Sequence, residues 1–213
     1  DRQQINYSFD FDYQKYFGSF KNIIIFDVGA NTGQSINRFR SIFINSTIHS
    51  FEPDLLAYEQ MKLKYSKFKN IIFNNVALGD KKFSKEINIY SQSTDNSFKN
   101  KKNDTPIRKD LVNVVKLDDY IAENKIEKIH ILKIDTQSYN KEILDGAKLS
   151  LDQGKFDLIE IEINLGEYYD YRNSFYEVEK YLSNYYLAGI NKSGSTLNNE
   201  KFYLDVFYLK KKL

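Results

Sequence analysis

The stretch IIIFDVGANTG, residues 23–33, decides how the rest of the chain is interpreted. It begins with a continuous apolar run that ends in an acid, Asp27, which is the pattern of a strand buried on both faces of a parallel sheet. It closes with Gly29 and Gly33, which allow a tight turn directly before a helix. This order predicts the first unit of an α/β fold, with a ligand close to the turn.

Strand and helix patterns alternate along the rest of the chain. Apolar residues at helical spacing follow the turn, at Ile36, Phe39, Phe43 and Ile44. We predict further strands over 47–51, 71–74, 129–134 and 158–163. We predict helices over about 54–65, 117–124 and 174–185, and one marked by Tyr139, Ile143, Ala147 and Leu151.

The segments between and after these elements complete the prediction. Two β-rich segments, about 186–191 and 201–209, are joined by a polar turn at 192–196, which predicts an antiparallel hairpin at a sheet edge. Residues 1–21 form a lead-in, and 86–90 an excursion strand. The length of 213 residues demands no second domain, so we predict one Rossmann-like domain over 1–213, with a mostly parallel sheet and helices on both faces.

Composition excludes several classes of function. The chain has 31 Lys and Arg against 29 Asp and Glu, so its charge does not predict a nucleic-acid partner. It has no Cys, which excludes disulfides, thiolate catalysis and zinc sites with sulfur ligands. It has two His, too few for a histidine metal cage. No apolar run approaches the roughly 20 residues that span a bilayer and no signal pattern opens the chain, so we expect a cytoplasmic protein without a membrane span.

The glycine turn differs from the dinucleotide-binding fingerprint in a way that indicates its ligand. Asn31 stands where that fingerprint has the glycine that clears space for a pyrophosphate. Asp27 would repel phosphates but suits the ammonium group of an amino-acid nucleoside. Glu52 ends the second strand, 19 residues after Gly33 (52 − 33), where it can accept both ribose hydroxyls. These residues favour S-adenosylmethionine, and the alternative is a tight turn with an incidental acid.

At this point the chain resembles the FkbM-type methyltransferases, from Ile23 to about Asn164. The matching motifs are DVGANTG at 27–33, FEP at 51–53, NVALGD at 75–80, LDDY at 117–120, LKID at 132–135 and ILDGA at 143–147. The resemblance implies a class I sheet of seven strands with the last antiparallel, and methyl transfer from S-adenosylmethionine, usually to a hydroxyl. It also implies cofactor contacts from Asp27, Gly29, Asn31 and Gly33 at the methionine end, Glu52 with Pro53 at the ribose, and Asn75 with Val76 near the adenine.

One part of the family pattern is altered. Family members commonly carry Gly and Glu where this chain has Ser138 and Asn140. An amide cannot act as a base, so a catalytic role of that Glu is not transferred to Asn140. The chemistry must rest on other groups or on positioning.

Catalytic candidates are the polar residues at the carboxyl ends of the fourth and fifth strands, Asp135, Glu162 and Asn164. Either acid could remove the proton of an acceptor hydroxyl. The three could instead hold a Mg²⁺-like ion, a less favoured alternative, so we assign no metal ligand. A further alternative is that Glu160 and Glu162 only solvate one face of their strand.

The basic segment 91–110 is predicted to be a mobile loop over the site, or else a solvated insertion without a role. Lys99, Lys101 and Lys102 could receive a phosphate, and Tyr168 and its neighbours Tyr169 and Tyr171 could stack on a sugar. We therefore predict O-methylation of a nucleotide-diphosphate sugar, a small-molecule substrate, for a capsular or other surface polysaccharide. The alternatives are a catalytically altered cofactor-binding module and a methyltransferase acting on RNA or a secondary metabolite. A homo-oligomer is left open.

Overall fold

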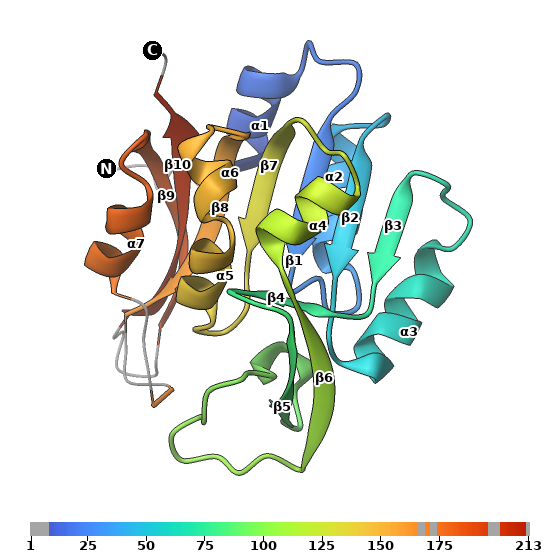
Figure 1. The fold of residues 1–213 in the computed structure, drawn as a ribbon, viewed down its shortest axis with the longest axis vertical. Helices are drawn as coiled ribbons and strands as arrows, with labels where there is room; N and C mark the ends of the chain where they lie inside the picture. Colours follow the sequence, from blue (N-terminus) through green and yellow to red (C-terminus); the bar gives the residue numbers. More distant parts are fainter. Residues whose placement is uncertain (1–8, 166–168, 171–173, 196–200, 212–213) are drawn as a thin grey trace, which may run out of the picture.

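The computed structural model describes residues 9–165, 169–170, 174–195 and 201–211. Its main feature is a seven-stranded sheet in the order β3-β2-β1-β7-β8-β10-β9 (Figure 1). The strands, in that order, are Ile71–Asn74, Thr47–Phe51, Ile24–Val28, Ile129–Ile134, Phe156–Asn164, Lys201–Lys210 and Tyr185–Ser195. β3 through β8 pair in parallel, whereas β10 lies antiparallel between β8 and β9. The Rossmann-like sheet with an antiparallel C-terminal hairpin is confirmed.

Helices cover both faces of this sheet because its inner strands are apolar on both sides. On one face lie α1 (Phe9–Phe17), α2 (Gln34–Ile42) and α3 (Leu55–Tyr65). On the other lie α4 (Leu117–Glu123), α5 (Asn140–Gly146), α6 (Lys148–Asp152) and α7 (Phe175–Tyr181). The alternation of side chains along β1 joins the two cores, since Ile25 packs into the first and Phe26 into the second.

A second, three-stranded sheet flanks the expected loop over 91–110 and takes in its last three residues, while most of 91–107 lies outside helices and strands. It has the order β4-β6-β5, with β4 at Ala77–Gly79, β6 at Arg108–Lys116 and β5 at Phe83–Ile89. The last residues of the expected loop begin β6, and Ser93–Asp95 form a short 3-10 helix, η1. The sequence hid β6 because only alternate residues, Val112 and Val114, are buried while Arg108 to Asp110 face outward or are half-buried.

Three smaller differences concern element ends. The expected lead-in contains α1, whose Tyr13 and Phe17 are buried. The helix marked by Tyr139 to Leu151 is divided at Ala147 into α5 and α6, and the one expected to reach 185 ends at Tyr181. The polar residues 192–195 belong to β9, so they are not the hairpin turn, and residue 196 lies outside the described residues. No helix in the described part of the chain is both long and apolar enough to cross a membrane.

Candidate active site

A cavity of about 590 Å³ lies where β1, β2, β7 and β8 end at their carboxyl termini. This volume is typical of small-molecule sites, which span roughly 300–1,000 Å³. Eight of the candidate site residues line it: Gly29, Asn31, Glu52, Pro53, Val76, Asp135, Glu162 and Asn164. Asp27, Gly33, Asn75, Lys99, Lys101 and Lys102 are not among its lining residues, and Tyr168 lies outside the described residues.

At Gly29 the glycine turn brings backbone, and no side chain, to the cavity. Gly29 has φ 81°, and a Cβ added there would lie 1.9 Å from the carbonyl oxygen of Asp135. The backbone N–H groups of Gly29 and Ala30 both donate to the carbonyl of Phe51, at 3.0 and 3.1 Å. The turn is therefore held against the ends of β2 and β7, and any side chain at Gly29 would push them apart.

Gly33 serves helix packing, not the cavity. A Cβ at this position, where φ is 88°, would lie 2.4 Å from the ring of Tyr65 on α3. The Tyr65 hydroxyl donates to the Gly33 carbonyl over 2.9 Å. The cofactor role that the family resemblance implies for Gly33 would thus be indirect: Gly33 would determine where α2 begins relative to the cavity.

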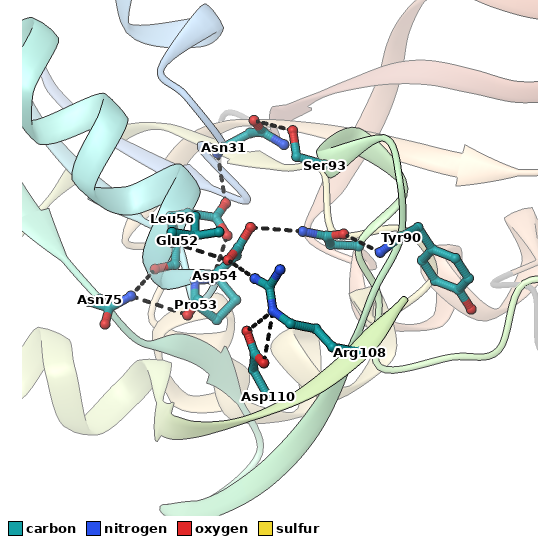
Figure 2. Close-up of polar contacts among 11 residues, drawn as sticks. Asn31, Glu52, Pro53, Asp54, Leu56, Asn75, Tyr90, Ser93, Arg108 and Asp110 are labelled. Atoms are coloured by element: carbon teal, nitrogen blue, oxygen red, sulfur yellow. Dashed lines mark hydrogen bonds and ion pairs between the residues drawn. The ribbon is translucent and has the colours of Figure 1, made fainter. Parts of the chain in front are cut away.

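Glu52 is a buried carboxylate with both oxygens already oriented (Figure 2). Its Oε2 accepts from the backbone N–H of Asn31 at 2.7 Å, and its Oε1 from that of Asp54 at 2.8 Å. Burial raises the pKa of Glu52 to about 7, although these two hydrogen bonds oppose the shift. The amide of Asn75 donates to the carbonyls of Glu52 and Pro53, so it supports the backbone behind the carboxylate.

Asp27 is fully buried beneath the glycine turn. The Ser35 side chain is a hydrogen-bond partner that lowers the pKa of Asp27, although no bond to either carboxylate oxygen reaches normal hydrogen-bond geometry within the described residues. The nearest ion-pair partner is Lys133 on the adjacent strand β7, with Nζ 4.0 Å from Oδ1. Burial raises the pKa of Asp27, and the positive charges of Lys133 and Arg38 oppose that shift. A buried acid without a hydrogen bond of normal geometry is costly, so this position suits a ligand cation.

Asp135 and Glu162 meet at the other end of the cavity, joined by Gln137. Lys133 Nζ lies 3.0 Å from Asp135 Oδ2. Gln137 Nε2 donates to Asp135 Oδ1 at 3.3 Å and to Glu162 Oε1 at 3.1 Å. Burial, with the negative charges of Asp135 and Asp205, raises the pKa of Glu162 well above its usual range. A higher pKa makes the ionised form of Glu162 a stronger proton acceptor than an exposed carboxylate.

The remaining polar residues here have structural partners. Asn164 Nδ2 donates to Ser138 Oγ at 3.0 Å. Asn140 is fully buried, donates to the Glu162 carbonyl at 2.5 Å and accepts from the Thr136 hydroxyl at 3.1 Å. A carboxylate could not donate to that carbonyl, so the amide at position 140 ties α5 to β8.

A roof segment, residues 93–98, closes the cavity and is fastened on two sides. Ser93 Oγ donates to Asn31 Oδ1 at 3.1 Å, and Asn96 Nδ2 to Asp54 Oδ2 at 3.0 Å (Figure 2). Arg108 Nη2 also reaches Asp54, at 3.4 Å. On the opposite side, Ser97 Oγ donates to the Gln137 carbonyl at 2.6 Å. Part of the expected mobile loop is therefore a bonded wall of the site.

The three candidate phosphate-binding lysines lie away from the lining. Lys99 Nζ is 2.8 Å from Glu142 Oε1, and Lys101 Nζ is 2.5 Å from Asp95 Oδ2 and 3.0 Å from Asp104 Oδ2. Among the described residues, all the charged side chains that line the cavity are acidic: Glu52, Asp95, Asp135, Glu162 and Asp205. The described residues contain no cluster of three or more His, Cys, Asp or Glu that could hold a metal ion.

Sequence reasoning missed Lys133, Gln137, the roof residues Ser93 and Asn96, and Tyr203 and Asp205 on β10. Lys133 and Gln137 flank Asp135 in sequence, so their nearness to it was the available signal. The others come from segments distant in sequence, and no local pattern marks them.

Comparison with known proteins places the chain among methyltransferases. The family described as "Methyltransferase FkbM domain" matches residues 27–186. A fibrillarin pre-rRNA processing protein of Methanococcus jannaschii is 13% identical with a TM-score of 0.54, over 91% of this chain and 68% of that one. An rRNA methylase of Streptococcus thermophilus is 12% identical with a TM-score of 0.51, over 90% and 89%. These two likenesses show a shared fold. A comparison with curated proteins gives no match.

Proposed function

The chain belongs to the FkbM methyltransferase family, and from this premise we propose that it methylates a sugar hydroxyl, as a step toward a capsular or other surface polysaccharide. Its dependence on S-adenosylmethionine follows from the family and the fold. The observation that carries the finer proposal is the pair of carboxylates at two ends of one cavity, the buried Glu52 and the half-buried Glu162. Glu52 suits a ribose, and Glu162 can accept a proton.

The residues of the glycine turn fit S-adenosylmethionine. We expect Asp27 to attract its ammonium group from beneath the turn, because no hydrogen bond of normal geometry reaches the two buried Asp27 oxygens within the described residues and Lys133 Nζ is 4.0 Å away. Gly29 and Asn31 would hold the methionine end, Glu52 and Pro53 the ribose, and Val76 the adenine, with Asn75 supporting from behind. When bound, S-adenosylmethionine supplies a methyl group that leaves its bonding electron pair on sulfur, so the leaving group is neutral.

The remaining task is to orient the acceptor and take one proton from its hydroxyl. Glu162 suits the second part, since its raised pKa makes it a better base than an exposed carboxylate. Asn164, Tyr203 and Asp205 offer polar groups in the same part of the cavity on which sugar hydroxyls can bond. These groups support O-methylation of a polyhydroxyl acceptor.

A nucleotide-diphosphate sugar is our proposed form of the acceptor, with its phosphates outside the cavity. The acidic lining would repel a diphosphate, whereas Lys99, Lys101 and Lys102 lie on the segment that follows the roof. To bind phosphate, Lys99 and Lys101 would have to share their charge with Glu142, Asp95 and Asp104. The acidic lining and near-neutral charge give no support to an RNA substrate.

The test is a panel of nucleotide-diphosphate sugars, the matching free sugars and RNA, each incubated with S-adenosylmethionine and analysed by mass spectrometry. The expected result is one added methyl group on a sugar oxygen, located by NMR. Methylation of RNA alone, or of nitrogen alone, would reject the proposal. Calorimetric binding of the cofactor without any product would favour the catalytically altered binding module.

The affinity for S-adenosylmethionine is expected to rise by about tenfold between pH 6 and pH 8, because ribose hydroxyls bond to ionised Glu52 and its pKa is about 7. The ionised fraction of Glu52 grows as the pH rises through about 7, so the affinity for the cofactor rises with pH. Titration calorimetry across this range measures it. Glu52→Gln should weaken binding and flatten the profile, while Glu59→Gln, at an exposed position of α3, should keep it. A slope that survives in Glu52→Gln would show that another group titrates.

A further inference from the structure

Gln137 is the one residue of the described chain for which hydrogen bonds to both acids, Asp135 and Glu162, are resolved. Its single amide nitrogen supplies both bonds, at 3.3 and 3.1 Å. A side-chain amide donates two protons and has no charge, so it can join two carboxylates that would otherwise repel one another. The sequence gives no sign of this role, since Gln is neither acid nor base.

The orientation of the Gln137 amide is fixed from the other side. The hydroxyl of Tyr169 donates to Gln137 Oε1 at 3.1 Å, and the same hydroxyl lies 3.2 Å from the Asp95 carbonyl. Because the amide oxygen faces Tyr169, the amide nitrogen must face the acids. Tyr169 is buried, so this arrangement is shielded from competing water.

The backbone at Gln137 and Ser138 is strained, and such strain is typical of functional sites. Gln137 has φ 48° and Ser138 has φ 75°, both in the left-handed region that non-glycine residues seldom adopt. Such strain persists where surrounding contacts enforce it, and it concentrates at functional sites. Here the enforcing contacts are Ser97 Oγ to the Gln137 carbonyl, 2.6 Å, and Asn164 Nδ2 to Ser138 Oγ, 3.0 Å.

We propose that Gln137 is a positioning residue that gives the two acids different tasks, holding Glu162 as the proton acceptor while Asp135 stays paired with Lys133. Asp135 accepts from Lys133 through one oxygen and from Gln137 through the other. Glu162 has no resolved ion pair among the described residues, and the Gln137 hydrogen bond and the charge of Lys133 favour its ionised form. The inference rests on the proposed function, because it assumes an acceptor with a hydroxyl proton to lose.

The charges around Glu162 determine the direction in which its pKa should change when the Gln137 amide is removed. Asp135 on β7 and Asp205 on β10 raise its pKa together with burial, while Lys133 on β7 and the Gln137 hydrogen bond lower it. Tyr203, also on β10, lies within electrostatic range of the same three acids. Removal of the amide donor leaves burial, Asp135 and Asp205 opposed by Lys133 without the Gln137 hydrogen bond, so the pKa of Glu162 must rise further.

The test measures the pKa of Glu162 by carbon NMR of glutamate-labelled protein, without cofactor or acceptor. Gln137→Met keeps the length of the side chain and removes the donor, and it should raise that pKa by about one to two pH units. The low-pH limb of the pH profile of kcat should shift to higher pH by the same amount. At high pH the kcat of the variant should return to the parent value, and the KM for the cofactor should change little. Gln60→Met, on the exposed side of α3, is the matched control and should shift neither.

Tyr169→Phe provides a second variant that leaves the amide in place and removes its orienting bond. It should shift the pKa of Glu162 in the same direction by a smaller amount, which keeps the inference testable if Gln137→Met does not fold. An unchanged pKa of Glu162 in either folded variant would overturn the inference. Because the titration needs no substrate, a failed sugar screen with a shifted pKa would reject the proposed acceptor and leave the role of Gln137 standing.

Discussion

Glu162→Gln is expected to lower kcat for methyl transfer by about 10²–10⁴-fold, the usual contribution of a positioned general base. The substitution keeps the size of the side chain and removes its ability to take a proton. Cofactor affinity should change little, because Glu52 lies at the other end of the cavity. Single-turnover kinetics and calorimetry separate the two effects. Glu59→Gln, on the exposed side of α3, is the matched control.

The same variant should also be more stable than the parent protein at neutral pH. Burial and nearby acids raise the pKa of Glu162 in the folded state. The folded protein therefore binds a proton that the unfolded chain releases above its own pKa, and this contribution to stability is lost as the pH rises through the folded-state pKa. Thermal unfolding should show a gain in Tm at pH 8 that shrinks toward pH 4.5. An unchanged kcat would assign the proton transfer to Asp135 or to water.

Asp27→Asn is expected to weaken S-adenosylmethionine binding by about 10²–10⁴-fold, since loss of one partner of a buried ion pair costs about 3–5 kcal/mol. The same change should raise the Tm of the cofactor-free protein, because it removes a carboxylate whose burial outweighs the favourable effects of Lys133, Arg38 and Ser35 and raises its pKa. Calorimetry and thermal unfolding without cofactor measure these opposite effects.

Asp152→Asn, an exposed acid at the end of α6, is the control for Asp27→Asn and should change neither quantity. If Asp27→Asn lowers the Tm of the cofactor-free protein as much as it weakens binding, Asp27 is a structural acid and the proposed ammonium contact is wrong. If binding is unchanged, the ammonium is held elsewhere in the cavity.

The sheet could be predicted from the sequence because its inner strands are apolar on both faces, and those segments have few alternative structures. β6 was missed because a strand with one solvated face and charged ends resembles a polar loop. Glu52 and Asp135 were found because strand ends converge at one edge of a parallel sheet. Gln137 could not be found, since its role depends on a left-handed backbone and on Tyr169, 32 positions away.

The lysines and Asn140 also show that contacts between residues distant in sequence could not be predicted. Lys99 and Lys101 were interpreted as phosphate ligands from their local composition, but their carboxylate partners include Glu142, which is distant in sequence. Asn140 was recognised as a departure from the family pattern, yet its use depends on the Glu162 carbonyl across the α5–β8 contact. Sequence shows which groups are available, and three-dimensional contacts determine whether they are already occupied.

The position of β10 determines when the sheet is completed during synthesis. β10 is made after β9 but inserts between β8 and β9, so β9 has no place in the sheet until β10 leaves the ribosome. Tyr203 and Asp205, which line the cavity, arrive with it. A nascent chain that ends before residue 201 thus exposes the edge of β8 and lacks one wall of its site, so β10 completes the sheet and the cavity together.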